Sequence, residues 1–340
     1  MDKNRRQTLN RREFIKGSMV GLATLPALSY GDLISGKKMK KEKVILVRTQ
    51  SREEGVREVL KLMDFPSVKA KKVLLKPNFN TADPTPGSTH NDTLTSLFKG
   101  LKGRGAAEIT VGERSGPPPT QGVMEQKGIF QLAEELGFKI INFEELEKQG
   151  LDEKNWVHFN PSGTHWKEGF YIPKPVVDAE YVVSTCCLKT HAYGGVFSMS
   201  LKLAVGLTPK SLMRELHSQR QGPMRKMIAE INQGYRPQLI VLDGIDAFVD
   251  GGPSRGTKKE AGVFLAGRDR VAIDAVGVAV LKELGSNEDI MGSRIFEQEQ
   301  IQRAAELGLG VSAPDQIEII TPDKPSREYA NKLESILAQS

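Results

Sequence analysis

Short apolar runs alternate with longer amphipathic segments from residue 43 onward, and this alternation limits the folds open to the chain. The runs at 43–49, 71–79, 107–115, 138–145, 179–191, 238–249 and 261–269 have the length and composition of strands. Segments with helical spacing separate several of them, at 52–65, 93–105, 129–137 and 270–285, and a last pair of segments follows at 301–310 and 317–322. Residues 150–175 are loop-like. The order predicts an α/β fold with a mostly parallel sheet and helices on both faces, arranged as one or two α/β lobes.

Polar residues follow five of the predicted strands at the points where they end. Ligands of open parallel sheets bind outside the carboxyl ends of the strands, so these residues are candidates for one shared site. They are Lys76, Asn78, Glu113, Arg114, Lys189, His191, Asp243, Asp246 and Asp269, and Gly252 lies beside them. Each alone has a plainer interpretation, because loops are polar in general, Asp269 is placed to cap the following helix and Asp243 suits a turn.

The stretch CLKTHAYGGVFSMSLKLAVG, residues 187–206, is the most unusual of these strand ends. Gly194 and Gly195 allow a ligand to approach the backbone closely. Ser200 and Lys202 follow on a short predicted helix within 197–206. Two ammonium groups, an imidazole and a helix start together predict a site for a phosphate or a carboxylate. The chain has no G-x-x-x-x-G-K-[ST] motif, and no G-x-G-x-x-G follows the first strand, which argues against the usual nucleotide sites.

The N-terminus has the features of an export signal. Arg11 and Arg12 precede a mildly apolar segment of small residues, a pattern that resembles the twin-arginine signal. We therefore expect a signal peptide at 1–30, a basic linker at 31–43, a main domain at 44–325 and a C-terminal tail or helix at 326–340. Export would place the protein in the periplasm or another extracytoplasmic space. The translocase would be a partner, and the membrane would be contacted only through an uncleaved signal. A basic amphipathic helix is the alternative.

The charge distribution and the cysteine content argue against two classes of protein, nucleic-acid binders and iron–sulfur proteins. The net charge of +6 arises from the N-terminal 43 residues, and the remainder is slightly acidic. With few aromatic residues as well, the main domain does not have the composition of a nucleic-acid binder. Cys186 and Cys187 are the only cysteines. Two cysteines cannot supply the four ligands of an iron–sulfur cluster, so they are either small apolar strand residues or a redox or metal pair beside His191.

Taken together, several segments resemble a known family, the DUF362 domain proteins of unknown function. The matching segments are KPNF (76–79), VGERSG (111–116), LKTHAYGGVFSMSLKLAVG (188–206), VLDGIDAFVDGGPSRG (241–256) and FLAGRDRVAIDAVG (264–277). Many relatives have Pro before the Lys-Thr-His segment, where this chain has Cys186-Cys187. Many also carry a cysteine-rich ferredoxin-like module that is absent from this sequence, so their redox association is not carried over. The resemblance implies no particular reaction.

Two hypotheses of function remain. In the first, the protein is an enzyme whose catalytic residues are His191, Lys189, Lys202 and Asp243. Its substrate-binding residues are Lys76, Asn78, Glu113, Ser200, Gly194, Gly195, Asp246, Gly252 and Asp269. His191 would act as acid and base, and an aspartate would orient it or bind a divalent metal. In the second hypothesis the same residues form a non-catalytic binding site or a metal or cofactor carrier. An electron-transfer protein is a weaker third alternative.

Overall fold

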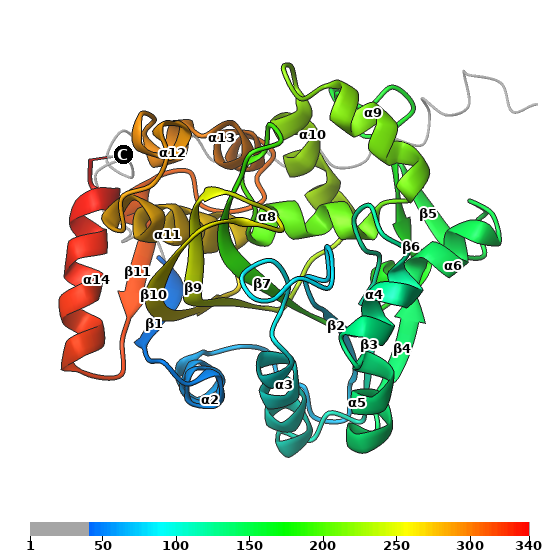
Figure 1. The fold of residues 1–340 in the computed structure, drawn as a ribbon, viewed down its shortest axis with the longest axis horizontal. Coiled ribbons are helices and arrows are strands. Elements are labelled where there is room, and N and C mark those ends of the chain that lie inside the picture. Colours follow the sequence, from blue (N-terminus) through cyan, green and yellow to red (C-terminus); the bar gives the residue numbers. More distant parts are fainter. Residues whose placement is uncertain (1–40, 340) are drawn as a thin grey trace, which may run out of the picture. The chain divides into compact units, whose positions relative to one another are not determined.

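One nine-stranded sheet organises residues 41–339, the part of the chain that this computed structural model describes (Figure 1). The strands lie in the order β11 (Ile317–Ile320), β1 (Glu42–Arg48), β10 (Gly256–Gly267), β9 (Leu239–Gly251), β7 (Tyr181–His191), β2 (Lys72–Lys76), β3 (Glu108–Glu113) and β4 (Lys139–Asn142), and β8 (Val196–Phe197) pairs with β7. All pairings along this order are parallel except those of β10 with β9 and with β1. The predicted α/β fold is confirmed, with one main sheet rather than two lobes. The predicted export signal lies outside the described residues.

Helices cover both faces of the sheet, as predicted. Figure 1 shows α2, α3 and α5 below the sheet and α8, α10 and α11 above it. The lower layer consists of α2 (Arg52–Leu62), α3 (Asn91–Gly103), α4 (Thr120–Gln126) and α5 (Ile129–Leu136). The upper layer includes α8 (Ser200–Leu203), α10 (Met224–Ile231), α11 (Arg270–Glu283), α13 (Glu299–Glu306) and α14 (Lys324–Leu337). Within residues 41–339, none of the helices has the length and hydropathy of a membrane span.

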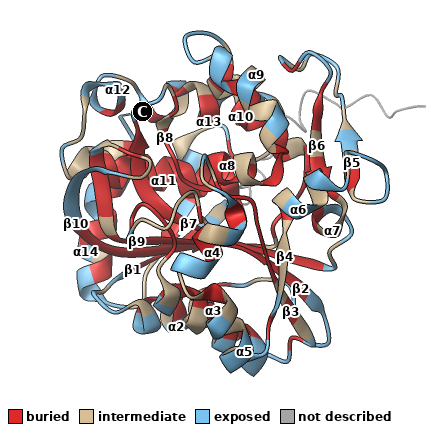
Figure 2. Cartoon of the chain, turned by 45° about the vertical axis from the view of Figure 1, so that its right-hand side comes forward, coloured by how far each residue is buried: buried red, intermediate tan, exposed pale blue. Residues whose placement is uncertain are grey.

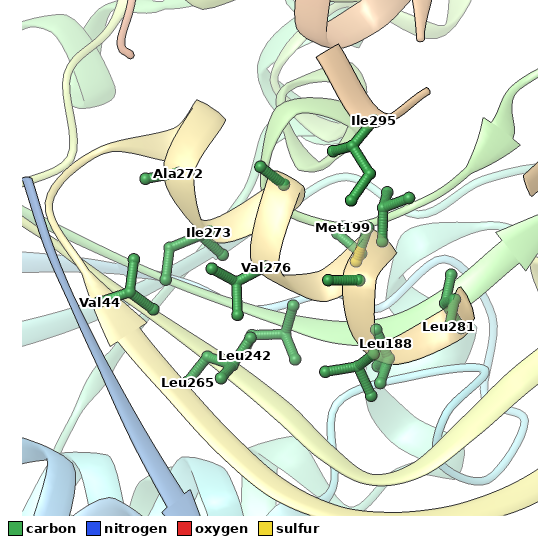
Figure 3. Packing of buried hydrophobic residues seen from close by; sticks show 14 of the residues in the cluster. Val44, Leu188, Met199, Leu242, Leu265, Ala272, Ile273, Val276, Leu281 and Ile295 are labelled. Atoms are coloured by element: carbon green, nitrogen blue, oxygen red, sulfur yellow. The ribbon is translucent and has the colours of Figure 1, made fainter. Parts of the chain in front are cut away.

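Helix α11 belongs to the upper layer and is buried along most of its length. Figure 3 shows its residues Ile273 and Val276 packed against Val44, Leu242 and Leu265 of the sheet. The other sides of α11 contact α8, α13 and α14, which explains why residues 270–281 are all buried. Each aliphatic side chain that is fully buried in this way stabilises the fold by about 1.5–3 kcal/mol.

The strand after residue 255 runs in the direction opposite to the one that we expected. β9 and β10 form a long antiparallel hairpin, whose turn contains Gly251 and Gly252 at positive φ. The end of β10 therefore lies at the edge of the sheet opposite to the ends of β7 and β9. Asp269 follows β10 and lies at that opposite edge. Its carboxylate caps α11 by accepting from Val271 N and Ala272 N, at 2.8 and 2.9 Å, and it also accepts from Val311 N.

Three local predictions also need correction. The strand expected at 138–145 ends at Asn142, because the Asn142 side chain accepts from Glu144 N and begins helix α6 (Phe143–Lys148). The loop expected at 150–175 contains an antiparallel pair, β5 (Trp156–Phe159) and β6 (Phe170–Pro173). The helix expected within 197–206 is only α8 followed by a 3₁₀ turn, Ala204–Leu207.

Candidate functional site

A cavity of about 350 Å³ opens at the carboxyl ends of β2, β3 and β7. The last residues of these three strands, Lys76, Glu113 and His191, all line it. Figure 2 shows β7 in the buried interior, and every residue of that strand is buried. The rest of the lining is Asn78, Phe79, Asn80, Arg114, Gly116, Pro117, Ser198, Lys202, Leu203, Val205, Gly206, Lys210, Met213, His217 and Pro253.

A buried ion pair forms one wall of this cavity. Lys76 Nζ lies 2.5 Å from Glu113 Oε1, and both side chains are almost fully buried. Burial lowers the pKa of Lys76 and raises that of Glu113, while their mutual attraction opposes both shifts. Glu113 also accepts from Phe79 N and Arg114 N, at 2.7 and 2.8 Å. The pair adds no net charge to the cavity.

Two further cations in or behind the wall form no ion pair among the described residues, although carboxylates lie near enough to act on their charge: Glu113, Glu147 and Glu144 on Arg114, and Asp83 on Lys189. Arg114 is buried, and its guanidinium donates to the carbonyl oxygens of Thr208, Ser115 and Val205. Burial lowers the pKa of Arg114 to about 10, so it stays charged near pH 7. Lys189 is also buried, and its Nζ donates to Asn78 Oδ1 at 3.0 Å and to Gly87 O at 2.6 Å. Lys189 does not line the cavity itself but holds Asn78, which does.

Lys202 is the third such cation. It lines the cavity on α8 and is only 8% exposed. No residue within 41–339 forms a hydrogen bond or an ion pair with its Nζ. Burial, with smaller contributions from the charges of Lys189 and Arg114, lowers the pKa of Lys202 to about 7. Its amine is therefore close to half protonated near neutral pH.

Two histidines face the cavity from different elements. His191 is 6% exposed, and its Nδ1 is buried without a hydrogen-bond partner among the described residues. Burial and the charges of Lys202 and Lys189 lower the pKa of His191 well below 6.5, so its imidazole is neutral near pH 7. His217, on α9 (Met213–Ser218), has Nδ1 2.7 Å from Met213 O, which leaves Nε2 available to a ligand if Nδ1 carries the proton.

The aspartates expected at the site lie elsewhere. Asp243 Oδ2 accepts from Arg52 Nε at 2.9 Å and from Thr93 Oγ1 at 2.7 Å, so it ties β9 to α2 and α3. Asp246 forms ion pairs with Arg52 and with Lys258. Neither aspartate lines the cavity, and neither contacts His191 through a hydrogen bond. The prediction that Asp243, Asp246 or Asp269 orients His191 is therefore wrong.

The backbone of Ser200 already has a partner as well. Asp274 Oδ1 accepts from Ser200 N at 2.7 Å, and Asp274 Oδ2 accepts from Leu201 N at 3.0 Å. A carboxylate of α11 thus occupies the start of α8, where we expected a bound anion. Ser200 does not line the cavity. Burial raises the pKa of Asp274 to about 7, and the two N–H donors oppose that shift.

Three of the glycines in the predicted site leave room for neighbouring groups. A Cβ on Gly195 would lie 2.8 Å from His191 Nδ1 and 3.1 Å from Lys202 Cε, so this glycine lets both side chains reach the cavity. Gly252 has φ +73°, and a Cβ there would clash with Thr190 O. Gly194 also has positive φ and lies against Arg220. None of the three lines the cavity itself.

The segment that contains the cavity residues also identifies the family of the chain. A family model described as a domain of unknown function (DUF362) matches residues 73–279. The chain belongs to this family. The DUF362 segment supplies every residue that lines the cavity.

Similarity to individual proteins is more distant. A curated relative, the thylakoid-associated protein sll1697 of Synechocystis sp. (strain ATCC 27184 / PCC 6803 / Kazusa), is 25% identical over 217 residues, which span 62% of this chain and 63% of that protein. Among solved structures, the lactate racemase apoprotein from Thermoanaerobacterium thermosaccharolyticum matches with a TM-score of 0.44 and 13% identity, over 85% of each chain. A Thermotoga maritima protein matches with a TM-score of 0.40 and 13% identity, over 75% of this chain and 58% of that one. These two matches are too weak to carry an inference about function.

Sequence reasoning found part of the DUF362 cavity and missed the rest. It named Lys76, Asn78, Glu113, His191 and Lys202, which all line the cavity. The lining residues that it did not assign to the site include Arg114, Asn80, Ser198, Lys210, Met213, His217 and Pro253. Arg114 follows directly on Glu113 at the same strand end, so the sequence places it at that edge of the sheet, but it was not assigned a role in the site.

No observation on the described residues favours a redox role for the cysteines or a bound metal ion. Cys186 and Cys187 are free and buried, and burial raises the pKa of both thiols, so they stay protonated near pH 7. Within residues 41–339, no group of three or more His, Cys, Asp or Glu side chains is placed to hold a metal ion. A divalent metal therefore stays a prediction.

Proposed function

We propose that this DUF362 protein is an exported enzyme that acts on a small organic anion bound in the cavity at the ends of β2, β3 and β7. The observation that carries the proposal is a group of buried cationic side chains that form no ion pair, and above all Lys202, whose amine has no partner among the described residues. Arg114, Lys189 and Lys202 are buried, and none forms an ion pair within the described residues. The one acidic residue in the lining, Glu113, is already neutralised by Lys76.

The protonated amine of Lys202 is buried without a hydrogen bond or an ion pair among the described residues, which is costly, and a ligand carboxylate or phosphate would offset that cost. Lys202 is the group best placed to contact the anion directly, because all the N–H donors of its protonated form are unused. Apolar side chains in the lining, including Phe79, Leu203 and Met213, would pack against the rest of the ligand. A cavity of about 350 Å³ is near the lower limit for small-molecule sites, which favours a small metabolite.

The neutral His191 imidazole supports the catalytic version of the proposal. Beside Lys202 it can accept a proton from a bound substrate and return it. A non-catalytic carrier would use the same cavity and would differ only in leaving its ligand unchanged.

Binding is tested with a panel of small carboxylates and phosphate esters, by thermal shift and by titration calorimetry at fixed ionic strength. At 100 times the dissociation constant, a bound ligand adds about 2.7 kcal/mol to stability. Lys202→Met is expected to weaken binding about tenfold or more, since a hydrogen bond to a charged group contributes about 1.5–3 kcal/mol. Lys61→Met, at an exposed position on α2, is the matched control and should bind normally. If no anion of the panel binds, the proposal is wrong.

Catalysis is distinguished from carriage by two measurements. Once a ligand is known, His191→Ala should abolish its conversion while the protein remains folded, and full activity of this variant would exclude the role. Mass spectrometry and elemental analysis of protein purified from its native compartment provide the second measurement. A stoichiometric retained metal or organic molecule would favour the carrier.

Export is tested through the paired arginines. Replacing Arg11 and Arg12 together by lysine should retain the protein in the cytoplasm, whereas the unchanged chain should appear in the periplasmic fraction. Equal distribution of the two proteins would contradict twin-arginine export.

A further inference from the structure

Lys202 differs from the other lysines of the cavity in having an amine that no residue occupies. Lys76 Nζ is bound to Glu113 and to Pro77 O, and Lys210 Nζ is bound to Glu144 and to Pro118 O. Lys202 Nζ has no such contact within residues 41–339, although the residue is 92% buried and lines the cavity. A buried amine that is free of hydrogen bonds has its lone pair available to a bound molecule whenever it is unprotonated.

The local structure holds this amine in place. Asp274 anchors the first two N–H groups of α8, and α8 carries Lys202 one residue later. Asn232 Nδ2 donates to Leu201 O at 3.0 Å from the other side. Gly195 lets the Lys202 side chain pass beside His191, since both lie about 3 Å from the position that a Cβ of residue 195 would take. The amine and the imidazole are therefore neighbours in the same wall.

The charge state of this amine near neutral pH suits a nucleophile. Burial and the positive charges of Lys189 and Arg114 lower the pKa of Lys202 to about 7. Desolvation beside other cations is the way in which lysine side chains are activated for attack on carbonyl groups. At pH 8, about nine-tenths of such an amine is unprotonated, against less than about one-hundredth of an ordinary lysine in water.

We propose that Lys202 forms a covalent imine with a carbonyl compound that carries a carboxylate or a phosphate. This inference rests on the proposed function, because the anionic group is what the positive cavity would bind. It adds a reaction type, a substrate class and the residue that forms the bond.

The chemistry balances with the groups of the site and with water. The lone pair of Lys202 Nζ attacks the carbonyl carbon, a C–N bond forms, and the carbonyl π electrons move to oxygen. A proton leaves the nitrogen and another reaches the oxygen, and His191 is placed to take up the first and supply the second. Loss of water then gives the C=N bond. Hydrolysis reverses these steps, and neither oxidant nor reductant is consumed.

The experiment traps the imine in the full-length protein. The protein is incubated at pH 8 with glyoxylate, pyruvate, 2-oxoglutarate or glyceraldehyde 3-phosphate in the presence of cyanoborohydride, which reduces C=N to a stable secondary amine. Peptide mapping by mass spectrometry then locates the adduct. Acetate, propionate, glutarate and glycerol 3-phosphate are the matched anions without an aldehyde or ketone group. Lys202→Arg keeps the charge without an amine nucleophile, Lys202→Met serves if the arginine variant does not fold, and Lys61→Arg controls for surface lysines.

The expected result is an adduct at Lys202 with at least one of the four carbonyl compounds. It should exceed labelling of exposed Lys61 by tenfold or more, be lost in Lys202→Arg and persist in Lys61→Arg. The matched anion should protect Lys202. If the anions bind by thermal shift but Lys202 is labelled no more than Lys61, the imine is refuted and the proposed binding function stands. If neither the carbonyl compounds nor the matched anions bind, both inferences are refuted.

Discussion

Replacing Lys202 by methionine is expected to stabilise the ligand-free protein, by an amount that depends on pH. The pKa of Lys202 falls from 10.5 to about 7 on folding, so below pH 7 the folded state holds an ammonium group that is more stable in water. One pKa unit corresponds to about 1.4 kcal/mol, which puts the cost on the order of 5 kcal/mol. Methionine has a similar length and no charge, and it removes this cost.

The sign of the pH dependence follows from proton counting. Between pH 7 and 10.5 the unfolded chain keeps the proton of Lys202 and the folded protein has lost it, so the wild-type protein becomes more stable as pH rises. Its disadvantage against Lys202→Met should shrink by about 1.4 kcal/mol per pH unit in this window, or roughly 3 kcal/mol between pH 7 and 9. Below pH 7 the difference should be constant.

Urea unfolding of both proteins at pH 6, 7, 8 and 9 measures this difference. Lys189, Arg114, His191, His217 and the Lys76–Glu113 pair surround Lys202. The comparison cancels the titration of groups that do not interact with Lys202, whereas the pKa of His191 is expected to rise in the methionine variant because the charge of Lys202 lowers it. Lys61→Met should change stability little and at every pH alike, because this lysine is exposed. A difference that does not vary with pH, or a methionine variant that is less stable at pH 6, would refute the unpaired buried amine.

Three further predictions address the same site. Binding of an anion should raise the pKa of Lys202 again, so calorimetry in buffers of different ionisation enthalpy should detect uptake of about 0.5 proton at pH 7 and about 0.9 at pH 8, and no uptake would contradict the low pKa. Gly195→Ala should weaken anion binding and lower the free energy of unfolding by about 1–3 kcal/mol, because its Cβ would crowd His191 and Lys202. The control Gly122→Ala, whose Cβ would meet no atom within 4 Å, should instead stabilise helix α4 by about 0.5–1 kcal/mol. Asp243→Ala should destabilise the fold by about 3 kcal/mol, since it leaves Arg52 and Thr93 without their acceptor. It should not change the affinity for anions. Loss of anion binding in the folded variant would show that Asp243 belongs to the site.

We predicted that residues at the carboxyl ends of strands share one site, and this prediction holds where neighbouring strands are parallel. β2 and β3 are parallel neighbours, so Lys76 and Glu113 had to end at the same edge, and they form a buried pair there. The same rule failed for Asp269 because β10 reverses direction. The turn at 251–256, rich in glycine and containing Pro253, is a hairpin signal that we interpreted as site residues.

Other errors came from features that periodicity does not encode. Asp243 lies in the first half of β9 and not at its end, and its side chain projects to the same face as Val241 and Ile245, toward α2 and α3 and away from the cavity. His217 and Lys210 lie in a segment of short helices with no strand before it, so no strand-end rule could place them. Only tertiary structure brings that segment over the ends of β2 and β3.

The position of β1 has a practical consequence for work on the DUF362 segment. Residues 73–279 begin after β1 and end inside α11, although β1 pairs with residues 263–267 of β10 in the middle of the sheet. In a protein cut at these limits, the backbone N–H and C=O groups of the apolar strand β10 that pair with β1 would have no partner. Such an exposed strand edge tends to pair with another molecule. We therefore do not expect residues 73–279 to fold as a unit on their own, and recombinant fragments should keep the flanking strands β1 and β11.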